Sequence, residues 1–117
     1  MVAHRLLVAG YQVVLLGSEK DREIGSAIAQ GVPLAHRSDL KNIIGQTSLL
    51  DAIDVIGLAR VVLTHDSGLM HIAAAVDRPI VALYGPSSME ETPPLSTQAQ
   101  MLTHAMPCQP CFARECP

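Results

Sequence analysis

The sequence is poor in aromatic residues and has no excess of positive charge. Trp is absent, and Tyr11, Tyr84 and Phe112 are the aromatic residues of a 117-residue chain. A core must therefore be filled with Leu, Ile, Val and Ala, which favours layered strands and helices over an aromatic-rich sandwich. The net charge is −3, and no basic stripe is present that could follow a phosphate backbone. We therefore expect no nucleic-acid partner.

The sequence also lacks a long hydrophobic run. No segment reaches the roughly 18 uninterrupted apolar residues of a membrane-spanning helix. Residues 1–17 resemble a signal peptide, but Gly10, Tyr11 and Gln12 interrupt the apolar run, and no cleavage site of small residues precedes the charged stretch 19–23. We therefore expect a cytoplasmic protein whose three cysteines are thiols rather than a disulfide framework.

Hydrophobic residues make up 49% of the chain, which is enough to bury the core of one domain. Strand-like and helix-like segments alternate, so the pattern predicts an α/β fold, an open parallel sheet with helices on both faces. Strand 12–16 is almost wholly apolar, which is typical of a strand covered on both faces. Ile24, Ala27 and Ile28 form the expected buried stripe of their helix. The predicted helices are 1–9, 19–30, 69–76 and one from Thr47 or Ser48 to about Ala59; the predicted strands are 12–16, 42–44, 60–64, 80–84 and 100–103.

Ligands of such folds bind beyond the carboxyl ends of the strands. Three strand ends are visible, at 17–18, 64–68 and 85–88, and the middle one is the richest. A helix that starts at Ser67 or Gly68 presents unpaired backbone N–H groups and a partial positive charge. Gly68 lets the backbone approach a bound group closely, and Ser67 adds a hydroxyl. These features suit an anionic ligand such as a diphosphate.

The same residues have ordinary structural readings of equal weight. Asp66 can cap the helix by accepting from the N–H of Gly68 or Leu69. His71, in the first turn, is placed either to donate to a phosphate oxygen or to pack under the turn. Asp21 can serve the helix dipole or accept from a ribose hydroxyl, although the G-x-G-x-x-G fingerprint is missing.

Metal sites are poorly supported by the spacing. His65 belongs to a strand while His71 lies on the following helix, so these side chains and Asp66 do not converge. Cys108 and Cys111 form a C-x₂-C pair, and with Cys116 they resemble part of a zinc site. The alternative is three free thiols. We expect a structural role in a longer chain, by zinc or by packing, with zinc the less favoured.

The combination of motifs resembles one enzyme family. The motifs are Thr64–Ala75 followed by 78–86, together with 16–21, 44–49, Thr92–Leu95 and the cysteine tail. Together they resemble glycosyltransferase family 9, the bacterial ADP-heptose:lipopolysaccharide heptosyltransferases. The resemblance covers nearly the whole chain.

The resemblance implies a GT-B enzyme, in which two Rossmann-like domains face each other across a cleft. Residues 1–104 would be the donor-binding domain, truncated at its N-terminus, and residues 105–117 a Pro/Cys-rich tail that continues into missing sequence. Carried over by motif, Asp66 would face the heptose and diphosphate of ADP-heptose, and Ser67, Gly68 and Leu69 would bind the phosphates with His71 nearby. Asp21 would bind the ribose and Thr47 would lie near the adenine.

The resemblance also implies an inverting transfer to the inner core of lipopolysaccharide. The general base would belong to the absent N-terminal domain, so we expect no catalytic residue in this chain and no activity of the fragment alone. No cofactor would be required, and assistance by Mg²⁺ stays open. Peripheral association with the cytoplasmic face of the inner membrane stays open too, because the acceptor is part of a membrane lipid.

Two residues depart from the family pattern, and two other functions remain in view. His65 stands where similar sequences carry Asn, and Met89 replaces a Pro. The main alternative is a non-catalytic α/β module that binds a nucleotide or phosphorylated ligand. The other is a small structural domain organised by a metal on the cysteines.

Overall fold

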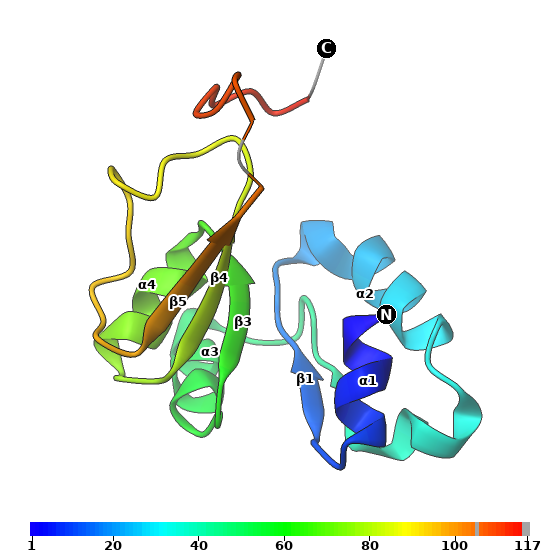
Figure 1. The fold of residues 1–117 in the computed structure, drawn as a ribbon. Coiled ribbons are helices and arrows are strands. Elements are labelled where there is room, and N and C mark those ends of the chain that lie inside the picture. The colour runs from blue at the N-terminus through cyan, green and yellow to red at the C-terminus, as the bar shows by residue number, and fades with distance from the viewer. Residues whose placement is uncertain (105, 116–117) are drawn as a thin grey trace. The chain divides into compact units, whose positions relative to one another are not determined.

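The computed structural model describes residues 1–104 and 106–115, and the chain divides into two compact units (Figure 1). The first unit, Met1–Ala52, contains α1 (Val2–Val8), β1 (Val13–Leu15), the 3₁₀ helix η1 (Glu19–Asp21), α2 (Arg22–Gln30), the 3₁₀ helix η2 (Leu34–Asp39) and β2 (Leu40–Asn42). Helix α3 (Leu49–Gly57) contains the division. The second unit, which begins at Ile53, contains β3 (Val62–His65), α4 (Gly68–Ala75), β4 (Ile80–Tyr84) and β5 (Ala99–Thr103). The predicted boundary after residue 104 stays a prediction.

Every strand pair is parallel, as the alternating pattern predicts. In the first unit β1 pairs with β2, and in the second unit the strand order is β3-β4-β5. Parallel sheets with flanking helices confirm the predicted α/β class. The strand predicted at 42–44 lies two residues earlier, at Leu40–Asn42, and the strand predicted at 60–64 begins at Val62. In the described residues, no helix is long and apolar enough to cross a membrane.

Gly10 ends α1 as the sequence predicts. Its φ is +94°, a left-handed conformation that glycine adopts at little cost. The N–H of Gly10 donates to the Leu7 carbonyl at 3.0 Å, and the N–H of Tyr11 donates to the Leu6 carbonyl at 3.1 Å. These two bonds form a Schellman motif, which satisfies carbonyls that the last turn leaves without partners.

The stripe predicted to be buried on α2, which begins at Ile24, is wrong by one position, because the buried residue is Gly25. Ile24 is 62% exposed, whereas Gly25 is buried against the side chains of Ile44 and Asn42. A glycine contributes nothing to a hydrophobic pattern, so the pattern could not mark this close approach. The expectation that strand 12–16 is covered on both faces is also wrong, because Val14 is 44% exposed.

The core of the second unit lies between α4 and one face of its sheet (Figure 1). Ile80, Ala82 and Tyr84 alternate along β4 and are buried, and Met70 and Ala73 of α4 are fully buried. The Tyr84 hydroxyl contacts Met70 Sδ at 3.5 Å, which places these two sets on the same side. The Met70–Tyr84 contact places the first turn of α4 beside the carboxyl end of β4.

Candidate functional site

Two of the predicted strand ends, 64–68 and 85–88, lie at the carboxyl edge of the second sheet. Strands β3 and β4 run parallel, with His65 opposite Leu83. The segment that starts at Asp66 and the segment that starts at Gly85 therefore leave the sheet at the same edge. This is the edge at which α4 begins.

The N-terminus of α4 is open. Ser67 is the N-cap residue, and its side chain makes no capping hydrogen bond in the part of the chain that the structure describes. A Cβ built at Gly68 meets no atom within 4 Å, so nothing in the described protein requires glycine at this position. The N–H groups of a first helical turn attract anions. The open turn therefore leaves room for a phosphate group to approach the backbone.

Asp66 does not cap α4, although capping was the ordinary reading of this residue. Its Oδ2 atom instead accepts a hydrogen bond of 2.8 Å from the hydroxyl of Thr92, which lies 26 residues away in sequence. The carboxylate is half-buried and is held at the sheet edge by this long-range bond. The predicted contact of Asp66 with a ligand stays a prediction, and the capping alternative is excluded.

Tyr84 holds the backbone of Thr92, the residue that binds Asp66. It is the last residue of β4, is 4% exposed, and donates a hydrogen bond of 2.6 Å to the carbonyl oxygen of Thr92. Burial raises the pKa of the Tyr84 phenol, and the nearby Asp66 carboxylate raises it further. The phenol therefore stays a neutral donor at physiological pH.

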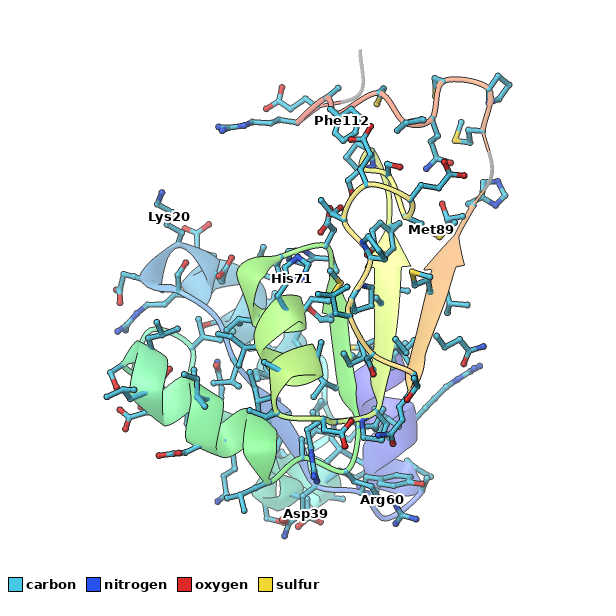
Figure 2. The ribbon with its side chains drawn as sticks, turned by 90° about the vertical axis from the view of Figure 1, so that its left-hand side faces the viewer. Lys20, Asp39, Arg60, His71, Met89 and Phe112 are labelled. Atoms are coloured by element: carbon cyan, nitrogen blue, oxygen red, sulfur yellow. The ribbon has the colours of Figure 1, made fainter. Side chains whose placement is uncertain are left out.

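The remaining predicted residues of this strand end lie on the first turn of α4. His71 is exposed, and Figure 2 shows it at the end of the helix nearest the segment that carries Met89. Leu69 is half-buried and Gly68 is exposed. His65 is exposed, and its Nδ1 lies 3.3 Å from the Asp66 carbonyl oxygen. The structure thus brings Asp66, Ser67, Gly68, Leu69 and His71 together.

Asp21 and Thr47 belong to the first unit, at the carboxyl edge of β1 and β2. The N–H of Gly45 donates to the Gly17 carbonyl at 3.0 Å, which joins the loops that follow the two strands. The Asp21 carboxylate accepts from the N–H and the hydroxyl of Ser18, at 2.8 and 3.1 Å. Asp21 thus performs a local turn-stabilising role, and its contact with a ribose stays a prediction. Thr47 is half-buried, two residues before α3.

The cysteine tail docks on the turn after β4. The N–H of Phe112 donates to the Pro86 carbonyl at 2.8 Å, and the side-chain amide of Gln109 donates to the Gly85 carbonyl. Cys108 and Cys111 are exposed free thiols, and Cys116 lies outside the described residues. Within 1–104 and 106–115, no group of three or more His, Cys, Asp or Glu side chains could hold a metal ion.

A cavity of about 400 Å³ opens between the 87–91 segment and the tail. Its lining includes Glu90 and Glu91. Two carboxylates repel a diphosphate, so an anionic group is better accommodated at the open turn of α4 than in this cavity.

Thr92 and Tyr84 were not identified as site residues from the sequence. Their contacts with the site depend on the fold, because Thr92 reaches Asp66 across 26 positions. The available signal was the Thr92-Pro93-Pro94-Leu95 motif, which carries the family resemblance but assigns no role to the threonine.

Comparison with known proteins gives consistent matches along the chain. A model of glycosyltransferase family 9 (heptosyltransferase) matches residues 1–117. Lipooligosaccharide heptosyltransferase 2 of Haemophilus influenzae and lipopolysaccharide heptosyltransferase 2 of Salmonella typhimurium are each 48% identical over 101 residues, which is 86% of this chain. The structure of Escherichia coli ADP-heptose lps heptosyltransferase II is similar with a TM-score of 0.84 and 46% identity, over 86% of this chain.

The matched part is a limited portion of each of these proteins. The chain spans 29% of the length of the two curated relatives and 30% of the E. coli chain. The matches therefore relate this chain to one region of longer proteins.

Proposed function

The chain belongs to glycosyltransferase family 9, the heptosyltransferases, and on that premise we propose that it forms the donor-binding part of an enzyme that transfers heptose from ADP-heptose to the inner core of lipopolysaccharide. The names of the Haemophilus and Salmonella relatives support the subtype heptosyltransferase 2. The observation that carries the proposal is the uncapped N-terminus of α4, with open space at Gly68 beside the Asp66 carboxylate.

The diphosphate of the donor binds at the first turn of α4. The backbone N–H groups of Ser67, Gly68 and Leu69 donate to its oxygens, and these donors stabilise the negative charge that grows on the leaving diphosphate during transfer. Asp66, itself an anion, is repelled by phosphate, so its carboxylate accepts from hydroxyl groups of the heptose. His71 lies within the same turn and donates to the diphosphate.

For the nucleoside of the donor we keep the two residues that the family resemblance implies. Asp21 accepts from the ribose hydroxyls and Thr47 lies beside the adenine. Binding at Asp21 requires that one carboxylate oxygen stays available while Oδ2 accepts from Ser18. A carboxylate has enough lone pairs for both tasks.

The acceptor-binding domain and the general base belong to the longer polypeptide in which we place this chain. The base deprotonates the acceptor hydroxyl, which then attacks the anomeric carbon in a single displacement with inversion. Because the acceptor is a lipid-linked sugar, we place the reaction at the cytoplasmic face of the inner membrane with peripheral association. We propose that no resident cofactor is required, since helix N–H groups stabilise the diphosphate charge, and the assay below tests whether Mg²⁺ assists.

A transfer assay with the polypeptide that contains this chain tests the proposal. Purified enzyme, ADP-heptose and inner-core acceptor are expected to give acceptor extended by one heptose, detected by mass spectrometry. The assay is repeated with added Mg²⁺ and with EDTA, and equal rates support donor-side binding without a metal. A non-catalytic nucleotide-binding module would bind ADP and other nucleoside diphosphates alike and produce no extended acceptor.

A further inference from the structure

Residues Ser88–Thr92 form a single tight turn over the carboxyl edge of the second sheet. The N–H of Thr92 donates to the Ser88 carbonyl at 3.2 Å. The Ser88 hydroxyl accepts from the N–H groups of Glu90 and Glu91, at 3.2 and 3.3 Å. The turn is thus stabilised by its own first residue, and it ends with the side chain of Thr92 directed at Asp66.

Thr92 is held from two sides. Its backbone carbonyl accepts the 2.6 Å hydrogen bond of the buried Tyr84 hydroxyl, and its own hydroxyl donates the 2.8 Å hydrogen bond to Asp66 Oδ2. Tyr84 ends β4 and Asp66 follows β3, so Thr92 links the ends of two neighbouring strands. The buried Tyr84 hydroxyl and the Asp66 carboxylate together fix the position of the threonine hydroxyl.

We propose that Thr92 is a positioning residue for Asp66, and that its hydroxyl fixes the orientation in which this carboxylate meets the sugar of the donor. The inference rests on the proposed function. Within the described residues, the Thr92 hydroxyl donates to Oδ2 of Asp66, which leaves Oδ1 to accept a hydrogen bond from a sugar hydroxyl. A carboxylate at a half-exposed edge otherwise samples several rotamers, and ordering it in advance removes that cost from binding.

The same hydroxyl has a second acceptor within reach. Thr92 Oγ1 lies 3.1 Å from the Ser88 carbonyl oxygen, and a hydroxyl carries one proton. The proton is therefore shared between Asp66 and the turn, with the shorter distance to the carboxylate.

Three variants in the polypeptide that contains this chain test the inference by calorimetric titration with ADP-heptose. Thr92→Val keeps the shape and removes the hydroxyl, so we expect donor affinity to fall about tenfold or more, the usual effect of losing a hydrogen bond to a charged group. Thr92→Ser restores the hydroxyl and is expected to bind within about threefold of the wild type. Thr97→Val is the matched control, an exposed threonine of the same connection, and is expected to bind normally.

The decisive readout is a double-mutant cycle with Asp66→Ala. If Thr92 acts through Asp66, Thr92→Val causes no further loss of affinity in the Asp66→Ala background. An equal loss in both backgrounds, or no loss in the wild-type background, overturns the inference. Failure of the wild type to bind ADP-heptose overturns the proposed function instead, and the inference with it. Circular dichroism of each variant verifies that the substitutions leave the fold intact.

Discussion

Replacing Gly68 by alanine separates the ligand-binding role of the α4 N-terminus from its structural role. The Cβ of the new side chain meets no protein atom within 4 Å, so the substitution causes no clash in the described structure. Its φ is not in the left-handed region, and alanine is a better helix former than glycine. We therefore expect the free energy of unfolding to stay the same or to rise by up to about 1 kcal/mol, and the melting temperature to stay the same or to rise with it.

The same methyl group occupies the space through which a phosphate reaches the backbone. Loss of one charge-assisted hydrogen bond costs about 1.5–3 kcal/mol. Donor affinity should then fall about 10- to 150-fold. Calorimetric titration with ADP-heptose measures this change. Gly57→Ala is the control, because a Cβ at Gly57, the last residue of α3, also meets no atom within 4 Å. Wild-type affinity in Gly68→Ala would refute the placement of the diphosphate at this turn.

Three further predictions test the fold and the site. Gly10→Ala should destabilise the chain by about 1–2 kcal/mol in urea unfolding because φ is +94°, whereas Gly57→Ala should not; equal effects would contradict this. The Ser48 N–H donates to the Asp51 carboxylate at 3.1 Å, and this bond, with a smaller contribution from the Ser48 side chain, holds the pKa of Asp51 below its ordinary value, so ionised Asp51 stabilises the fold above about pH 4 and this contribution is lost on further acidification. Ser48→Ala keeps the N–H and removes the smaller contribution, so it should raise that pKa only slightly in an NMR titration, and a return to the ordinary value would contradict the backbone cause. Asp66→Ala should reduce heptose transfer at least about a hundredfold with the fold intact and a modest fall in melting temperature from the lost bond to Thr92, and near-normal turnover would remove Asp66 from the site.

The topology was predictable because local signals agree with it. Apolar strands alternate with helices, and glycine or proline marks most of the boundaries, as at Gly10 and at 78–79. Details that depend on packing were not predictable. Gly25 is buried because Ile44 packs on it, and a hydrophobic pattern registers side chains rather than their absence. Strand limits shifted by one or two residues, since pairing partners decide where a ladder ends.

The site was predictable where its residues are neighbours in sequence. The stretch from Asp66 to His71 has strand-end and helix-start chemistry within six positions, so its location could be inferred from local pattern alone. The role of Thr92 could not, because its hydroxyl meets Asp66 only after β3, β4 and the 88–92 turn that follows β4 are in place. From the sequence, Asp66 could equally have capped α4, and the structure excludes this interpretation.

Hydrogen–deuterium exchange of the polypeptide that contains this chain, with and without ADP-heptose, tests the donor site most directly. The backbone amides of Ser67, Gly68 and Leu69 lack a capping side chain in the free protein. If they bind the diphosphate, they exchange more slowly when the donor is present. Diphosphates of other nucleosides are expected to slow their exchange by a smaller factor. Unchanged exchange at these three amides with saturating ADP-heptose would contradict the account.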